Sequence, residues 1–234
     1  MNRRQFSSVS MAAMVILATT RPRHALALTL DDISKADATS ALKSALEKGT
    51  LSAVGLLGSV DGFLGNEKVR IALPSNLQDA AQLIRTFGQG SKVDELVTAM
   101  NRGAEAAVPL AKDLLVRAVQ NMSVGDAKGI LGGGDTAATD FFASKTRNTL
   151  SIQFLPIVTR ATERIGLAEK YNQVGGKAAE MGLIKKEDAN IEQYVTAKAL
   201  DGLFSMISEE EQKIRRNPAG YGSAIMTKVF GALR

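Results

Sequence analysis

One stretch of this chain, residues 190–218, carries its longest helix pattern and limits the fold more than any other feature. Asn190, with a glutamine three residues on, predicts a helix N-cap, and Pro218 predicts the end of the helix. At about 1.5 Å per residue, the helix would be about 39 Å long, the width of a small domain. Its apolar side chains cover close to half of the circumference, so we expect other helices to pack on it from several sides.

The last turns of this helix change in character after Ser208, where three glutamates are followed by two arginines. These charges predict a solvated helix end with ion pairs at i,i+4 spacing. Glu210 alone of the three glutamates falls on the apolar stripe. It either turns inward to meet Arg102 or Arg70, or marks the point where the helix leaves the core. Asp201 falls on the polar face by helical phase.

The other patterns along the chain are helical as well, and the segments that join them are short. Apolar residues recur at helical spacings over residues 31–58, over several segments between residues 75 and 181, and in a last short helix that carries Ile225 and Phe230. Short connections favour antiparallel neighbours. We therefore predict an all-α fold, in which residues 28–234 form a single-domain, irregular antiparallel helical bundle around the long helix.

Capping and breaking residues predict where these helices begin and end. Ser75, Ser91 and Ser123 each stand three residues before an acidic or amide side chain, which predicts capping boxes. Asp135 follows three glycines and predicts the N-cap of the next helix, rather than a phosphate-binding loop, because no Gly-Lys-Ser/Thr signature is present. Pro156 predicts an interruption of that helix.

A turn and a short arm separate the first two helical stretches. The turn, residues 61–66, has the sequence DGFLGN, and its Phe63-Leu64 pair is predicted to plug into the bundle. The arm, residues 67–74, is the one place where alternating apolar residues suggest a strand. Oxygen ligands for Ca²⁺ are available in the turn, Asp61 among them, but their spacing is not that of an EF-hand, so we assign no metal.

The first 27 residues predict a secretory signal peptide. They combine a basic start, an apolar run too short to span a membrane, and a small-residue cleavage site at residues 25–27. Arg3 and Arg4 resemble a twin-arginine signal, while the general secretory route stays open. Either route predicts a periplasmic protein, cleaved near Ala27, without a transmembrane segment in the mature chain. Peripheral association with the envelope remains compatible with this reading.

Without the signal peptide the chain is nearly neutral. The whole sequence has 29 Lys and Arg against 24 Asp and Glu, and residues 1–27 hold four of the basic residues and none of the acidic ones. The mature chain therefore has 25 basic and 24 acidic residues, a net charge of +1, and it has no tryptophan. We expect neither nucleic acid nor an anionic membrane as its partner.

The mature chain contains no residue for several common chemistries. Its single histidine, His24, leaves with the signal peptide, and cysteine is absent. This excludes Ser-His-Asp and Cys-His nucleophilic machinery, histidine-based zinc sites, iron–sulfur ligation and histidine-ligated haem. No cofactor is predicted, and any catalysis must use carboxylates, lysine, tyrosine or serine.

Several charged residues stand out against apolar surroundings and form a candidate polar site. Arg102 lies in an alanine-rich helix, where we expect it to pair with a carboxylate from another helix, with an anion site as the alternative. No catalytic or metal-binding residue is assigned. The candidate residues are Asp61, Arg70, Arg102, Glu105, Asp135, Asp201 and Glu210.

Four strings, in this order, carry a resemblance to a known family. They are DGFLGN with the following IALP, then AMNRGAEAAVP, then ILGGGDTAAT-FF, and finally YVTAKALDGLF-MI-EEE-KIR-NPA. Together they resemble a bacterial exported family known only as domain of unknown function 4197, over residues 41–231. The resemblance implies a mostly helical envelope protein and implies no reaction. It also implies a general secretory signal, from which the twin-arginine start departs.

Two classes of function follow from these patterns. The leading hypothesis is a non-catalytic periplasmic protein that binds a protein partner or an apolar small molecule between its helices. The alternative is a hydrolase that works through paired carboxylates, for which Asp61, Arg102, Asp201 and Glu210 are the candidates. A purely structural or stress-related envelope protein is a third possibility. A pocket lined by two or more of the candidate residues would distinguish among them.

Overall fold

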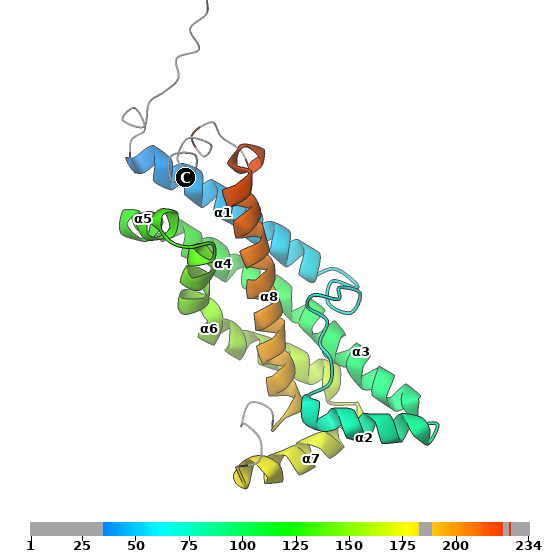
Figure 1. The fold of residues 1–234 in the computed structure, drawn as a ribbon. Coiled ribbons are helices and arrows are strands. Elements are labelled where there is room, and N and C mark those ends of the chain that lie inside the picture. Colours follow the sequence, from blue (N-terminus) through cyan, green and yellow to red (C-terminus); the bar gives the residue numbers. More distant parts are fainter. Residues whose placement is uncertain (1–34, 183–188, 222–224, 226–234) are drawn as a thin grey trace, which may run out of the picture.

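The described part of the chain is entirely helical in its regular elements. It comprises residues 35–182, 189–221 and Ile225 of a computed structural model (Figure 1). The α-helices are α1 (Lys35–Leu57), α2 (Ser75–Thr86), α3 (Gly90–Ala107), α4 (Ala111–Gln120), α5 (Val124–Gly132), α6 (Ala137–Thr162), α7 (Gly166–Glu180) and α8 (Ile191–Arg216). Two 3₁₀ segments are η2 (Val108–Leu110) and η4 (Pro218–Tyr221). The all-α prediction is confirmed.

Helix α8 is the centre of the bundle, as predicted (Figure 1). The side chain of Asn190 accepts a hydrogen bond from the backbone N–H of Gln193 at 2.9 Å and caps the helix, which ends at Arg216 just before Pro218. Helices α6, α1 and α3 all pack against it. Its buried side chains join those of the other helices in one hydrophobic cluster. None of the helices in the described ranges is long and apolar enough to cross a membrane.

Two of the three predicted capping boxes are wrong. The box at Ser123 is present, with hydrogen bonds in both directions between the serine and the residue three positions on. Helix α2 instead begins at Ser75 itself, and α3 begins at Gly90 without a side-chain cap. The carboxylate of Asp94, which was to complete the second box, binds Arg85.

The predicted interruption at Pro156 is also wrong, because α6 continues through it to Thr162. A proline inside a helix cannot donate to the carbonyl four residues earlier, here that of Ile152. Both residues are exposed, so water can take the place of the missing donor. Around Pro109, in contrast, α3 ends and a 3₁₀ turn leads into α4, in agreement with the sequence.

The arm does not form a strand. Residues 67–69 make a turn and residues 70–74 run without regular structure alongside α8 (Figure 1). The apolar alternation is nevertheless real, because Val69, Ile71 and Leu73 are all buried. They are buried against helices rather than against a second strand.

Two predicted segments lie outside the described residues. These are the signal peptide, residues 1–27, and the last short helix apart from Ile225.

Candidate functional site

The turn at residues 61–66 has a backbone that restricts which residues fit at Asp61 and Gly62. Asp61 has a φ of 65°, a left-handed conformation that aspartate tolerates better than most residues. A Cβ at Gly62 would lie 2.4 Å from the carbonyl oxygen of Leu56, so no larger residue fits there. The turn drives the fully buried ring of Phe63 onto Gly202 of α8. The predicted plug is confirmed for this phenylalanine.

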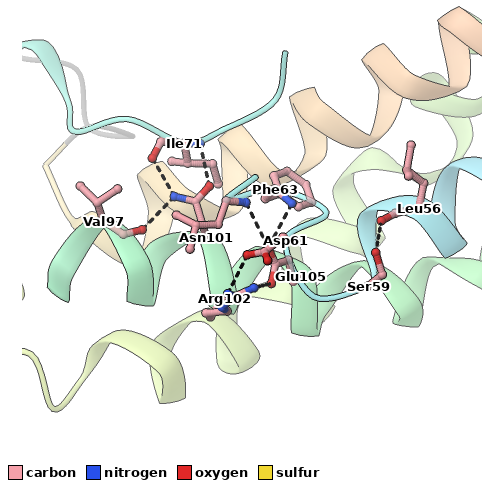
Figure 2. A network of polar contacts seen from close by, with 10 residues as sticks. Leu56, Ser59, Asp61, Phe63, Ile71, Val97, Asn101, Arg102 and Glu105 are labelled. Carbon is pink, nitrogen blue, oxygen red and sulfur yellow. Dashed lines mark hydrogen bonds and ion pairs between the residues drawn. The ribbon is translucent and has the colours of Figure 1, made fainter. Parts of the chain in front are cut away.

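A polar network on α3 holds this turn from below (Figure 2). Glu105, 5% exposed, accepts hydrogen bonds from the backbone N–H groups of Phe63 at 3.1 Å and Leu64 at 3.0 Å. Its second oxygen lies 2.6 Å from Nη1 of Arg102, whose Nη2 is 2.8 Å from Asp61. The hydrogen bond that Arg102 donates to Glu105, followed by the one to Asp61, raises the pKa of Arg102, so this guanidinium stays charged.

The structure thus brings together three of the predicted residues, Asp61, Arg102 and Glu105. The predicted partner on another helix is wrong, because Arg102 pairs within its own helix and with the turn. Each carboxylate in this network already shares the same arginine. The arrangement is suited to fixing the turn rather than to proton transfer, which needs an acid or base free to change its protonation state.

One helical turn before Glu105, Asn101 fixes the arm in the same way (Figure 2). Its Oδ1 accepts the backbone N–H of Ile71 at 2.8 Å, and its Nδ2 donates to the carbonyl of Ile71 at 2.9 Å. The same Nδ2 also donates to the carbonyl of Val97 at 2.8 Å. Asn101 is fully buried, so the arm is anchored on α3 by a side chain that has no contact with water.

A groove of about 420 Å³ opens between the arm and α8. We call it the arm groove. The side chain of Tyr194 crosses one end, where its hydroxyl donates to the carbonyl of Ala72 at 3.0 Å. The lining residues are Lys68, Val69, Arg70, Ile71, Ala72, Tyr194, Lys198, Asp201, Gly202 and Ser205. Two of the predicted site residues, Arg70 and Asp201, are therefore at this groove.

The charges of the arm groove are mostly positive. Lys68 binds Glu209, and Lys198 lies 4.0 Å from Asp201, which binds Arg147 more closely. Arg70 is exposed and has no ion-pair partner within the described ranges.

The charge of Arg70 nevertheless acts on Asp94 of the neighbouring helix α3. The pKa of Asp94 is lowered mainly by its hydrogen bond to Arg85, and the charge of Arg70 adds the smallest contribution. Asp94 is engaged by Arg85 and forms no ion pair with Arg70 in the described part of the chain.

The remaining two candidates lie elsewhere. Glu210 is buried, as its helical phase predicts, but it packs on Gly49 of α1 and forms its ion pair with Lys213 at 2.6 Å. It meets neither of the arginines proposed for it. Asp135 is exposed in the turn before α6, and the N-cap position of that helix is Thr136, without a side-chain hydrogen bond. The predicted Asp135 cap is wrong.

Glu211 takes the role that the sequence suggested for Asp135. Its carboxylate accepts the backbone N–H groups of Ala138 and Thr139, both at 2.9 Å, at the start of α6. It also binds Arg215 at 2.7 Å, and that guanidinium reaches the carbonyl of Ile130. The i,i+4 pair with Arg215 was predicted, but as part of a solvated helix end. The sequence carries no signal for its burial or for its contact with α6, 72 residues away.

No metal site is formed by the described residues. Nowhere in this part do three His, Cys, Asp or Glu side chains come together as ligands. Asp61, one of the oxygen ligands of the turn, is engaged by Arg102.

Comparison with known proteins identifies the family of this chain. Residues 32–231 match the family described as protein of unknown function DUF4197, which covers the turn, the arm and all of α8. No curated protein and no solved structure matches the chain. Since the match extends over most of the sequence, the chain belongs to the DUF4197 family.

Proposed function

We propose that this protein is a non-catalytic periplasmic binding protein that holds a protein partner in the arm groove. The observation that carries the proposal is the state of Arg70. It is an exposed guanidinium without an ion-pair partner in the described part of the chain, and it lines a groove whose wall is anchored from behind. A preformed wall lowers the entropy lost on binding.

The ion pairs of the other candidates support a binding role over hydrolysis. Asp61 and Glu105 bind Arg102, and Glu210 binds Lys213. Hydrolysis by two carboxylates requires one protonated acid and one free base on either side of a substrate. Asp201, which does line the groove, is paired with Arg147. The carboxylate hydrolase therefore lacks a second carboxyl group in the arm groove.

The lining of the groove also favours a protein partner over an apolar small molecule. Pockets for apolar ligands are lined mainly by apolar side chains with a few polar groups. The arm groove instead presents three cations and an exposed stretch of backbone. Native mass spectrometry of the purified protein tests the alternative of an apolar ligand. A bound lipid of defined mass would support that alternative over a protein partner.

Photo-crosslinking in living cells tests the proposed function. A benzophenone amino acid replaces Ser205 in the arm groove, and Ser144, exposed on α6, is the matched control position. We expect an adduct of discrete mass at position 205 that is lost on Arg70→Glu and retained on Lys112→Glu, a charge reversal on the exposed face of α4. Failure to obtain this groove-specific adduct overturns the proposed function and favours a purely structural role.

The periplasmic part of the proposal has its own test. Cell fractionation locates the full chain and an Arg3→Lys, Arg4→Lys variant. We expect the wild-type protein in the periplasm, shortened near Ala27. Retention of the double variant in the cytoplasm indicates the twin-arginine route, and unchanged export indicates the general secretory route. A full-length wild-type chain in the cytoplasm contradicts the localisation.

A further inference from the structure

We infer that the arm groove takes an extended, acidic peptide segment, which pairs with the backbone of the arm and places a carboxylate on Arg70. This inference rests on the proposed function and names the chemistry of the partner. Three features support it: an unused backbone edge, the shape of the groove, and the charge of its lining.

One backbone edge of the arm is closed and the other is open. Both the N–H and the C=O of Ile71 are bound by Asn101 on α3. In an extended chain the N–H and C=O of one residue point to the same side, and the groups of the flanking residues point to the other. The carbonyl of Arg70 and the N–H of Ala72 therefore face away from α3.

A second contact gives the same direction. The carbonyl of Ala72 accepts a hydrogen bond from Tyr194 on α8, so the N–H of the same residue also faces α8 and the arm groove. Within the described ranges, neither this N–H nor the carbonyl of Arg70 has a hydrogen-bond partner. Together they form one donor and one acceptor at the spacing that an added strand uses.

The shape of the groove suits a short extended segment. Residues 68–72 form one wall, and α8 from Tyr194 to Ser205 forms the other. Residues 67–69 make a turn, so the extended part of this wall is residues 70–72. At about 3.3 Å per residue it extends over about 10 Å, so the matching segment has about three residues. A volume of about 420 Å³ is too small for a folded element and suits such a segment.

The charge of the lining selects an acidic segment. Lys68 is paired with Glu209, and the other two cations, Arg70 and Lys198, oppose a single lining carboxylate, that of Asp201, which is itself bound to Arg147. The unpaired guanidinium of Arg70 has the planar geometry that binds a carboxylate through two parallel hydrogen bonds. A peptide satisfies the open backbone pair and the cation together, which a free anion does not.

Binding of synthetic pentapeptides to the purified protein tests the inference. The probe is an acetylated and amidated peptide of sequence VTETV, with VTKTV as its charge control and a copy methylated on the central backbone nitrogen as its hydrogen-bond control. We expect VTETV to bind at least tenfold more tightly than either control, a difference of about 1.4 kcal/mol or more. Arg70→Gln should weaken binding of VTETV at least tenfold, and Lys112→Gln on α4 should leave it unchanged.

Amide hydrogen exchange gives a second readout on the same samples. On binding of VTETV, exchange of the Ala72 amide should slow, since that N–H gains a partner. The Ile71 amide, already bound to Asn101, should not change. Binding of either control as tight as that of VTETV, no effect of Arg70→Gln, or no binding at about 1 mM peptide each overturns the inference.

The two levels of the proposal fail separately. If the adduct at position 205 forms in cells and depends on Arg70 while VTETV does not bind, the acidic strand is the wrong occupant and the proposed function stands. If no adduct forms, the proposed function itself is wrong.

Discussion

The side-chain amide of Asn101 takes the place of a neighbouring β-strand for Ile71, accepting its N–H at 2.8 Å and donating to its carbonyl at 2.9 Å. An all-α protein has no second strand to offer an extended segment, and backbone groups buried without partners are costly. The buried side-chain amide of Asn101 on α3 supplies these hydrogen-bond partners to the arm. The alternating apolar residues of the arm therefore indicate burial on one face, and the backbone pairing comes from a side chain.

Replacement of Asn101 by leucine should destabilise the protein. Leucine has a similar size but leaves the N–H and the carbonyl of Ile71 without partners, at a cost of about 1–3 kcal/mol for each buried group. We expect a loss of more than about 2 kcal/mol in the free energy of unfolding, measured by urea denaturation. The control is Asn148→Leu on the exposed face of α6, which should change stability by less than about 0.5 kcal/mol. Equal effects of the two substitutions would contradict the anchoring role of Asn101.

Substitution of Gly202 by alanine should reveal how closely the turn packs on α8. A Cβ at this position would lie 2.8 Å from Cε1 of Phe63 and 3.3 Å from Cβ of Val69. Overpacking costs about 1–3 kcal/mol, more than the gain of up to about 1 kcal/mol when alanine replaces glycine in a helix. We expect a net loss of stability in thermal unfolding.

Two further variants make the Gly202 result specific. Gly55→Ala in α1 has no atom within 4 Å of the new Cβ, so it should stabilise by about 0.5–1 kcal/mol. Phe63→Leu should cost less in the Gly202→Ala background than in the wild type, because the smaller side chain relieves the contact. If Gly202→Ala stabilises as much as Gly55→Ala, the ring is not confined as the structure indicates.

Some of the signals that act within one helical turn were predicted correctly from the sequence, although the boxes at Ser75 and Ser91 were not. The cap of α8 by Asn190 and the box at Ser123 each depend on residues three positions apart, and both form. The apolar phase of α8 likewise placed Glu210 in the interior, where it lies. Helix content and the central helix follow from patterns of this range, because local spacing is what a helix enforces.

Contacts between separate helices account for part of what was predicted wrongly. Asp94 binds Arg85 instead of capping α3, and Glu211 of α8 caps α6 in place of Asp135. Both choices depend on where helices meet, which side-chain spacing does not encode. The candidate site divides in the same way, since Asp61 and Arg102 come together across 41 residues although the sequence indicated a partner on another helix. The open backbone edge of the arm follows from the hydrogen bonds between Asn101 and Ile71, which the sequence does not indicate.

Loss of Glu211 should be among the most damaging single changes in α8. Its carboxylate is 2% exposed and holds Arg215, 13% exposed, as well as two N–H groups of α6. Removing one partner of a buried ion pair costs about 3–5 kcal/mol, because the other charge remains buried. We expect Glu211→Ala to lower the free energy of unfolding by about this amount in urea denaturation.

A neighbouring glutamate provides the control for Glu211. Glu209 belongs to the same triplet, is 30% exposed, and pairs with Lys68 at the surface, so Glu209→Ala should cost less than about 1 kcal/mol. Combining Glu211→Ala with Arg215→Ala should cost less than the sum of the two single changes. Additive effects would show that the two side chains act independently.

Acid should remove the contribution of Asp126 to stability. The hydroxyl of Ser123 and, to a smaller extent, its backbone N–H donate to this carboxylate and lower its pKa from the usual value, with a further small effect from the charge of Lys145. Because the folded-state pKa is the lower one, the stabilisation is complete above the unfolded-state pKa of about 3.9 and is lost as the pH falls through the folded-state pKa. We therefore expect Asp126→Ala to reduce the urea midpoint at neutral pH, and the difference from wild type to shrink as the solution is acidified below about pH 4. Ser123→Ala removes the main donor to this carboxylate. Over the same pH range, the difference in urea midpoint between Ser123→Ala and Asp126→Ala should therefore be smaller than the difference between wild type and Asp126→Ala. A difference between wild type and Asp126→Ala that stays constant down to about pH 2 would show that the ionised carboxylate is not what caps α5.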